Sequence, residues 1–357
     1  MLQRPKIVAE LSANHNQDLN LAKESLHAIK ESGADFVKLQ TYTPSCMTLN
    51  SKEDPFIIQG TLWDKENLYE LYQKASTPLE WHAELFELAK KLDLGIFSSP
   101  FSSKALELLE SLDCPMYKIA SFEIVDLDLI EKAARTKKPI ILSSGIATHT
   151  ELQDAISLCR EVGNFDITLL KCVSAYPSQI EDANLLSMVK LGETFGVKFG
   201  LSDHTIGSLC PILATTLGAN MIEKHFILNK SLQTPDSAFS MDFNGFKSMV
   251  EAIKQSVLAL GEEEPKINPK TLEERRFFMR SLFVIKDIQK GEALTSDNIK
   301  ALRPNLGLHP KFYKEILGQK ASKFLKANTP LSADGIEKRN FKQFLITDFT
   351  HALNKAH

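Results

Sequence analysis

The chain lacks the features that mark several large classes of protein. Its 357 residues include only five cysteines, an odd number with no CxxC pair, which argues against a disulfide framework. No stretch approaches the roughly 18 consecutive apolar residues of a membrane span. The N-terminal MLQRPKIVAEL has neither a signal-peptide core nor a cleavage site. We therefore expect a protein of the reducing cytoplasm that does not associate with membranes.

Charge of one sign is also scarce. The formal net charge is -3 and the isoelectric point is near 6.3, with no basic run, so we expect no nucleic-acid partner. The nucleotide-binding patterns GxGxxG and GxxxxGK[ST] are absent as well. Any anion that this chain binds must therefore be held by a few local side chains, and a nucleotide is not the expected phosphate carrier.

What the chain does have is a recurring pattern over residues 7 to 225. Short apolar runs alternate with segments of helical period, and the runs end in polar residues that could bind an anion, a metal or a carbonyl. There are eight runs: Ile7–Leu11, Phe36–Tyr42, Gly95–Ser99, Met116–Ala120, Pro139–Ser143, Ile167–Val173, Val197–Ser202 and Met221–His225. Strands that alternate with helices pair in parallel, and eight such units close into a (β/α)8 barrel with its reactive residues at the carboxyl ends of the strands.

Helix start signals fall where this barrel needs them. Thr77-Pro78-Leu79-Glu80 combines a capping box with a first-turn proline, and a second box, Thr148 to Glu151, follows the fifth strand. Asp126 is a candidate cap after the fourth strand. The segment from Thr43 to Ser76 is longer than ordinary loops of this kind, which leaves two interpretations open: a peripheral insertion packed on the rim, or a lid that contacts substrate.

The length predicts more than one domain, because a single barrel takes about 250 residues. We expect a catalytic barrel over residues 1–262 and a charged, proline-punctuated linker over 263–279. A compact module with little helical pattern should occupy residues 280–340, and an amphipathic tail of unassigned role should follow over 341–357. The small core of the module favours docking against another surface.

Two histidines stand at the predicted ends of the last two barrel strands. His204 and His225 could approach one point on the rim, and two imidazoles leave coordination positions open for water and substrate. Such a donor set suits Mn²⁺ or a similar ion, with Mg²⁺ as an alternative. A single histidine on an apolar strand is more often a core residue, so the proposal rests on the pair.

Two lysines are predicted inside the mouth of the barrel. Lys38 shares a strand face with Gln40, and Lys118 ends the fourth run. A buried ammonium group loses several kcal/mol of hydration unless an anion replaces the water, so the lysines predict a bound anion such as phosphate. Hydroxyl donors that could assist them are Ser99, Ser121, Ser143 and Ser202. The competing interpretation is that the lysines reach outward and the serines are small packing residues.

Three carboxylates are candidates by position. Glu10 ends the first run, Glu123 follows the fourth, and Asp236 lies beyond His225. Each could transfer a proton or accept a hydrogen bond from a substrate hydroxyl, although carboxylates are usually surface groups. Cys114, Cys172 and Cys210 lack a partnering histidine pattern, which favours buried structural thiols over a nucleophile.

The motifs built on these residues resemble one known family. AELSANHNQD, VKLQTYTP, FSSPFS, YKIASFE, ILSSGIAT, KCVSAYP, GLSDHT and EKHF are similar, in this order, to the sialic acid synthase family of phosphoenolpyruvate-condensing barrels. In the C-terminal module, RSLFVIKDIQKGEALT and LRPNLGLHP resemble the antifreeze-like (SAF, β-clip) domain that follows the barrel in that family. The match covers nearly all of residues 5 to 340.

The resemblance implies a reaction and a set of roles. The family condenses phosphoenolpyruvate with the open-chain aldehyde of an N-acetylated amino sugar and releases phosphate by C–O cleavage. His204 and His225 would hold a divalent metal, Mn²⁺ or Mg²⁺ with Co²⁺ as a further alternative, and would count as catalytic together with Glu10 and Glu123, either of which could transfer the proton. Phosphoenolpyruvate would be bound by Lys38, Ser99, Lys118, Ser121, Ser143, Ser174 and Ser202. The sugar would be bound by Glu10, Gln40, Tyr176, Asp236 and Arg303.

Arg303 carries the expectation about partners. In the family, the matching arginine of the antifreeze-like domain reaches the sugar site of a neighbouring subunit, which implies a domain-swapped homodimer. Without the resemblance, an isolated arginine in LRP would be read as a solvated surface charge.

The expectation about the sugar substrate rests on one segment and on two positions that differ from the neuraminate synthases. GTLWDKENLYELYQKASTPLEWH resembles the pseudaminic acid synthase branch, which implies 2,4-diacetamido-2,4,6-trideoxy-L-altrose as the sugar and a product used for cell-surface glycans or flagellin. Ser174 and Ser99 stand where neuraminate synthases carry asparagine and threonine, which argues against a neuraminate substrate. Two alternative substrates stay open, N-acetylmannosamine and the legionaminate precursor. Two alternative functions also stay open: another phosphoenolpyruvate aldol-type synthase and a non-catalytic sugar-binding scaffold.

Overall fold

The computed structural model describes residues 3–262, 264 and 268–337, and it forms two compact units that divide between Glu263 and Glu264. The predicted tail, 341–357, lies outside the described residues. Among the helices of the described residues, none is both long enough and apolar enough to cross a bilayer.

The first unit is a closed parallel barrel. Its strands pair in sequence order and the ring closes through β1 and β8, where Glu10 lies opposite His225. The barrel strands are β1 (Lys6–Glu10), β2 (Phe36–Thr41), β3 (Gly95–Pro100), β4 (Tyr117–Ile119), β5 (Ile140–Ser143), β6 (Ile167–Cys172), β7 (Lys198–Asp203) and β8 (Met221–Ile227). All eight predicted strands are confirmed to within about two residues at most ends. A short ninth strand, β9 (Met241–Asp242), pairs with the end of β8.

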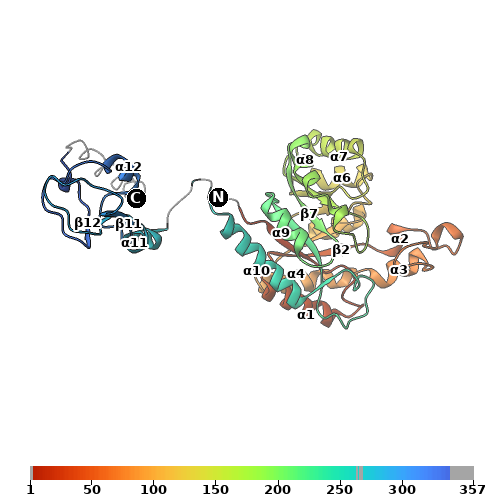
Figure 1. Ribbon diagram of the computed structural model, residues 1–357. Helices are drawn as coiled ribbons and strands as arrows, with labels where there is room; N and C mark the ends of the chain where they lie inside the picture. Colours follow the sequence, from red (N-terminus) through yellow and green to blue (C-terminus); the bar gives the residue numbers. More distant parts are fainter. Residues whose placement is uncertain (1–2, 263, 265–267, 338–357) are drawn as a thin grey trace. The chain divides into compact units, whose positions relative to one another are not determined.

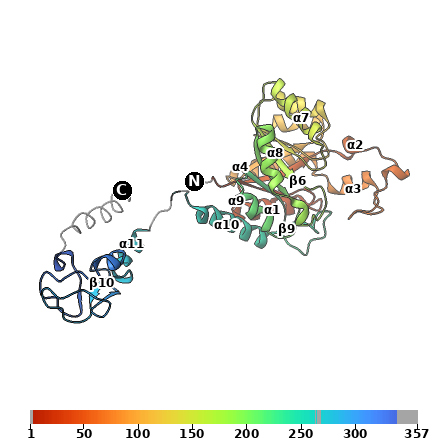
Figure 2. The same cartoon turned by 45° about the horizontal axis from the view of Figure 1, so that its top comes forward.

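Eight helices surround the barrel: α1 (Leu19–Ser32), α4 (His82–Lys91), α5 (Ser103–Ser111), α6 (Leu127–Arg135), α7 (His149–Glu161), α8 (Leu186–Phe195), α9 (Leu209–Thr216) and α10 (Phe243–Leu260). Helix α10 packs against α1 and α9 (Figure 2). Side chains alternate along each strand, so Val37 and Leu39 enter the apolar layer under the helices while Lys38 and Gln40 face the barrel interior. The fold thereby collects the polar strand residues in one place.

The helix caps agree with the sequence in two places and differ in one. Asp126 caps α6, and Thr148 with Glu151 forms the capping box of α7. The box predicted at Thr77 is wrong. The hydroxyl of Thr77 instead lies 3.2 Å from Nε2 of the buried His15, and the chain continues as the short helix η2 (Leu79–Trp81) before α4 begins.

The long segment after β2 forms an insertion, residues 43–76. It contains α2 (Pro44–Met47), η1 (Asp54–Phe56) and α3 (Leu68–Ala75), and it projects from the barrel (Figure 1, orange). Asn67 caps α3 by accepting hydrogen bonds from the amides of Tyr69 and Glu70. A shorter helix, η3 (Glu181–Ala183), lies between β6 and α8.

The second unit is small and built around a three-stranded antiparallel sheet in the order β11-β10-β12. Its elements are α11 (Pro269–Phe278), β10 (Ser281–Val284), β11 (Ile299–Leu302), η4 (Pro310–Phe312), α12 (Tyr313–Ile316), β12 (Thr329–Pro330) and η5 (Ala333–Gly335). Leu282, Val284, Ile299 and Leu331 are fully buried in its own core. This unit therefore has the compact core expected of a separate domain.

Helix α11 differs from expectation, because residues 263–279 were predicted to be a linker. Asn268 caps the helix through the Lys270 amide and Pro269 occupies its first turn. This Asn-Pro pair is a helix start signal that outweighs the surrounding charge and the lack of an apolar stripe.

Candidate active site

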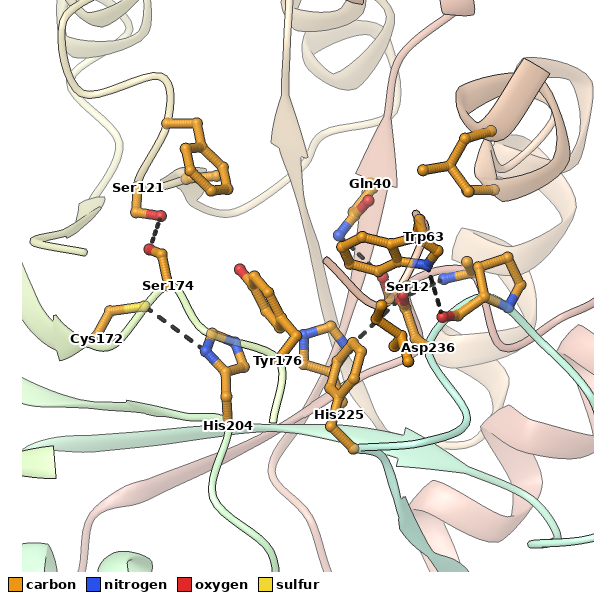
Figure 3. Close-up of a pocket in the computed structure, with 18 of the residues that line it drawn as sticks. Ser12, Gln40, Trp63, Ser121, Cys172, Ser174, Tyr176, His204, His225 and Asp236 are labelled. Carbon is orange, nitrogen blue, oxygen red and sulfur yellow. Dashed lines mark hydrogen bonds and ion pairs between the residues drawn. The ribbon is translucent and has the colours of Figure 1, made fainter. Parts of the chain in front are cut away.

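A cavity of about 780 Å³ opens at the carboxyl ends of the barrel strands. Most of the predicted site residues line it: Lys38, Gln40, Lys118, Ser121, Glu123, Ser143, Ser174, Tyr176, Ser202, His204, His225 and Asp236. We call the part of this lining at the strand ends the floor. It comprises Lys38, Lys118, Ser143, Ser202, His204, Glu223 and His225, together with the buried Glu10 that contacts Lys38. Figure 3 shows Ser121 and Ser174 on one side of the two histidines, and Ser12, Gln40 and Asp236 on the other.

Three predicted residues do not line the cavity. Glu10 is fully buried beside it, where its carboxylate contacts Lys38 and accepts a hydrogen bond of 3.1 Å from Gln40. Ser99 is buried on β3, and its hydroxyl has no hydrogen-bond partner among the described residues. Arg303 belongs to the second unit and is exposed.

The buried lysines have carboxylate partners within the protein. Nζ of Lys38 lies 2.8 Å from Glu10 and 3.1 Å from Glu223, and Nζ of Lys118 lies 3.5 Å from Glu223. The sequence predicts a bound anion as the counter-charge, whereas the structure provides two carboxylates. Glu223 was missed as a site residue, although its alternation with His225 in EKH placed it on the same strand face.

The two carboxylates differ in charge state. Burial raises the pKa of Glu10 to about 7, against the opposing effect of Lys38. Burial would also raise the pKa of Glu223, but the ammonium groups of Lys118 and Lys38 outweigh it and hold that pKa at about 2. Glu10 and Glu223 outweigh burial and raise the pKa of Lys38, whereas burial lowers the pKa of Lys118, so an anion bound at the floor would stabilise the charged form of Lys118.

The histidines face each other across the floor. Their ring centroids are 5.3 Å apart, which allows both to bind one ion at nitrogen–metal distances of about 2.1 Å. Nδ1 of His204 donates a hydrogen bond of 2.9 Å to the carbonyl of Val173, so in the neutral form of the ring Nε2 carries the free lone pair. Nδ1 of His225 is buried and has no hydrogen-bond partner among the described residues; it lies 3.7 Å from a carboxylate oxygen of Asp236.

Burial and the neighbouring His204 lower the pKa of His225 well below its usual value, so its imidazole is neutral. A neutral imidazole with an orphaned nitrogen fits a metal ligand. Within the described residues no group of three or more His, Cys, Asp and Glu side chains forms a metal cluster, so water and substrate would fill the other positions around an ion held by this pair.

A small cradle lies beside the lysines. The hydroxyls of Ser121 and Ser174 are 2.8 Å apart, and Gly145, with φ +32°, lies against both. A Cβ at Gly145 would come within 2.1 Å of Cβ of Ser121, so only glycine leaves this space. Hydroxyl donors next to two ammonium groups suit the oxygens of a phosphate or carboxylate.

Aromatic rings form the boundary next to the histidines. The ring centroid of Tyr176 lies 4.4 Å from that of His204 and 5.0 Å from that of Phe239. The ring centroids of Phe239 and His225 are 4.9 Å apart. Trp63 of the insertion lies 6.0 Å from Tyr176 and donates a hydrogen bond of 3.1 Å to the Pro235 carbonyl. The insertion therefore contributes to the cavity, as the lid interpretation predicts. Trp63 lies in the segment on which the substrate expectation rests, whereas no sequence pattern pointed to Phe239.

Comparison with known proteins follows the same division of the chain. The NeuB family model matches residues 25–265, and the SAF domain model matches residues 279–337. A pseudaminic acid synthase of Helicobacter pylori is 95% identical over 338 residues, covering 95% of this chain and 99% of that protein. A pseudaminic acid synthase of Campylobacter jejuni is 51% identical, covering 90% of this chain and 93% of that one.

Among solved structures, the sialic acid synthetase of Leptospira borgpetersenii in complex with citrate superimposes with a TM-score of 0.68 at 29% identity, covering 76% of this chain and 90% of that chain. The barrel, the strand-end site and the C-terminal module thus agree with the sequence match. The chain belongs to the NeuB family, the sialic acid synthases, and consists of a (β/α)8 barrel followed by an SAF domain.

Proposed function

We propose that this protein is a pseudaminic acid synthase. It condenses phosphoenolpyruvate with the aldehyde of 2,4-diacetamido-2,4,6-trideoxy-L-altrose and releases phosphate. The observation that carries the proposal is the convergence of Lys38, Lys118, His204 and His225 on one cavity, together with 95% identity to a pseudaminic acid synthase. The reaction is a C–C bond-forming transfer that leaves a nine-carbon α-keto acid.

Phosphoenolpyruvate would lie on the floor. Lys38 and Lys118 face its negative groups, and Ser143, Ser202 and the Ser121–Ser174 pair supply hydroxyl donors. Ser143 has a buried hydroxyl with no hydrogen-bond partner among the described residues, which is the state expected of a donor that awaits a ligand. We keep Ser99 as a buried supporting residue of this group.

The imidazoles of His204 and His225 would hold a divalent ion, Mn²⁺ or Mg²⁺, with Co²⁺ as an alternative. Such an ion supplies Lewis-acid polarisation of the aldehyde oxygen. The hydrogen bond from Nδ1 of His204 to the Val173 carbonyl holds the orientation of that ring, and burial lowers the pKa of His225 and keeps its imidazole neutral, as a metal ligand must be.

The sugar would lie between the histidines and the insertion. Gln40, Tyr176 and Asp236 line that side of the cavity, and Glu10 positions Gln40 from behind. Close placement of the aldehyde carbon and the enol carbon makes the bond-forming step effectively unimolecular.

The bonds change in a fixed order. C3 of phosphoenolpyruvate attacks the aldehyde carbon, and positive charge develops at C2. A water molecule adds to C2, and the C2–O bond to phosphate then breaks, so the keto group forms and inorganic phosphate leaves. The aldehyde oxygen gains a proton. Burial raises the pKa of Glu123 and of Glu10 to about 7, so either could supply the proton near neutral pH: Glu123 directly, because it lines the cavity, and Glu10 through a neighbouring group, because it is buried beside the cavity.

The test uses purified protein, phosphoenolpyruvate labelled with ¹⁸O at the bridging oxygen, and Mn²⁺. Each of three sugars is supplied in turn: the diacetamido-trideoxy-altrose, the legionaminate precursor and N-acetylmannosamine. We expect a product of the mass of pseudaminic acid from the first, with the label in the released phosphate. Turnover confined to N-acetylmannosamine, or label retained in the sugar acid, would contradict the proposal.

We also propose a domain-swapped homodimer in which Arg303 reaches the sugar site of a second copy. Exposed apolar side chains in the loops after β4 to β7 support an interface on the barrel rim: Phe122, Val125, Ile146, Ile180 and Ile206. Neighbouring strands place these loops side by side.

The dimer can be tested by complementation. Arg303→Ala and His225→Ala chains should each be inactive alone, and co-expressed chains should regain activity because one of the two sites in a mixed dimer carries neither change. A monomer in light scattering, or no regained activity on co-expression, would contradict the dimer.

The cytoplasm suits this protein, because phosphoenolpyruvate is made there and four of its five free cysteines are buried thiols.

A further inference from the structure

One part of the cavity lining is apolar. Ile58, Leu68, Leu71 and Tyr72 of the insertion line it, together with Tyr42 from the end of the second strand run. The Tyr42 ring lies 5.9 Å from Tyr72 and 5.3 Å from Phe101, both edge to face, so the rings form one continuous surface. We call these residues, with Phe101, the apolar wall.

The wall faces space that the condensation does not need. The reacting groups are fixed at the floor, because the charged ends of phosphoenolpyruvate require the lysines and the aldehyde must lie by His204 and His225. With the aldehyde held there, the remainder of a six-carbon sugar would occupy the part of the cavity that the insertion lines. The end of the sugar farthest from the aldehyde would then meet the wall.

We infer that the apolar wall is the specificity-determining surface of this enzyme, and that it receives the C6 methyl group and the methyl of the C4 acetamido group of the sugar. This inference rests on the proposed function. Those two methyl groups are what the diacetamido-trideoxy sugar has and N-acetylmannosamine lacks, since the latter carries hydroxyls at both carbons. A wall of leucine, isoleucine and aromatic carbon gains free energy from methyl groups and offers hydroxyls few partners.

The strength of this selection has a physical ceiling. One methylene contact in an apolar pocket is worth roughly 10- to 200-fold, and such a pocket rejects an added hydroxyl by about 100-fold at most. A sugar in which a hydroxyl replaces one hydrogen of the C6 methyl group should therefore still be converted at a measurable rate. That analogue, 2,4-diacetamido-2,4-dideoxy-L-altrose, gives a selectivity ratio that can be measured in every variant.

Leu68 provides the matched pair of variants. Leu68→Gln and Leu68→Met place side chains of nearly equal length and shape at the start of α3, and they differ mainly in polarity. Leu49→Gln makes the same chemical change on a side chain of the insertion that is 70% exposed and does not line the cavity. Ile58→Thr tests a second wall position that lies outside α3.

The measurement is kcat/KM for the 6-deoxy sugar divided by kcat/KM for the 6-hydroxy analogue, with Mn²⁺ and saturating phosphoenolpyruvate. We expect a ratio of about 10 to 100 in the natural protein and in Leu49→Gln, close to that value in Leu68→Met, and near 1 in Leu68→Gln and Ile58→Thr. The KM for phosphoenolpyruvate should stay within about twofold, because that ligand lies on the floor.

Two failures can be told apart. Equal ratios in Leu68→Gln and Leu68→Met, or a ratio near 1 in the natural protein that turns over both sugars, would overturn the specificity role and leave the synthase assignment standing. A natural protein that forms no product from the 6-deoxy sugar would instead overturn the proposed function, and the inference with it.

Discussion

The floor and the apolar wall of the cavity are held in place by different means. Floor side chains project from strand ends whose backbones are hydrogen-bonded on both sides in a closed barrel. Four of the six wall side chains stand on an insertion whose short helices α2 and α3 are joined by irregular chain, and only Tyr42 and Phe101 come from the ends of barrel strands. Changes in the floor should therefore act on chemistry and folding stability, while changes in the wall should act on which sugar is accepted.

The largest effect expected from the floor concerns the proposed metal ligands. His225→Ala removes one of two imidazoles from a site where Lewis-acid polarisation contributes several kcal/mol, so we expect kcat to fall about 1,000-fold. Phosphate release with Mn²⁺ and saturating substrates measures it. A chelator should abolish the activity of the natural protein and have little further effect on the variant. A loss below tenfold, with the fold intact by circular dichroism, would contradict the assignment.

A comparison within the floor separates its two buried carboxylates. Glu223→Gln leaves two buried ammonium groups without their ionised partner, and breaking a buried pair in this way costs about 3 kcal/mol or more. Glu10→Gln should cost much less, because a carboxyl with a pKa of about 7 is already neutral about half the time at pH 7. Urea unfolding of both variants at pH 7 measures the difference, and equal losses would refute this division of roles.

The floor could be anticipated from the sequence because each of its parts is a local pattern. Apolar runs of strand length predicted the eight strands, and alternation along the second strand predicted that Lys38 and Gln40 face the interior. The pairing of Glu10 with Lys38 and of Ser202 with Glu223 needs the register of the closed barrel, which no single run contains. This is why the counter-charge of the lysines was missed.

The wall could not be anticipated in the same way. Helix α3 spans only eight residues, too few for an apolar period to assign its faces, and the Tyr42–Tyr72–Phe101 contacts join three separate segments. Local signals also compete with tertiary partners. Thr148 acts as the cap that its sequence predicts, whereas the hydroxyl of Thr77 is turned inward beside the buried His15.

Glu123 allows a smaller, pH-dependent test at the edge of the floor. Burial raises its pKa to about 7, and one of its carboxylate oxygens is buried with no hydrogen-bond partner among the described residues. Because the folded-state pKa exceeds that of the unfolded chain, the native state binds the extra proton between about pH 4.5 and 7, so the stabilisation is full below this window and is lost as pH rises through it.

In the variant Glu123→Gln this loss should be absent. The stability of the natural protein relative to Glu123→Gln should fall by about 2 kcal/mol from pH 4.5 to pH 7.5, a value reduced for partial exposure of the residue. The pH dependence of kcat near pH 7 identifies the proton donor. If it disappears in Glu123→Gln and persists in Glu10→Gln, Glu123 transfers the proton. The opposite pattern would assign it to Glu10.

The smallest effect belongs to the contact that ties the insertion to the loop after β8. Trp63→Phe keeps an aromatic ring beside Tyr176 but removes the indole N–H that donates to the Pro235 carbonyl. A hydrogen bond of this kind contributes about 1 kcal/mol, so we expect the KM for the sugar to rise about fivefold. The KM for phosphoenolpyruvate and the folding stability should hardly change, because the insertion lies outside the barrel ladder. A larger change for phosphoenolpyruvate than for the sugar would mean that floor and wall are coupled through Trp63, and that the insertion helps to order the floor as well as to select the sugar.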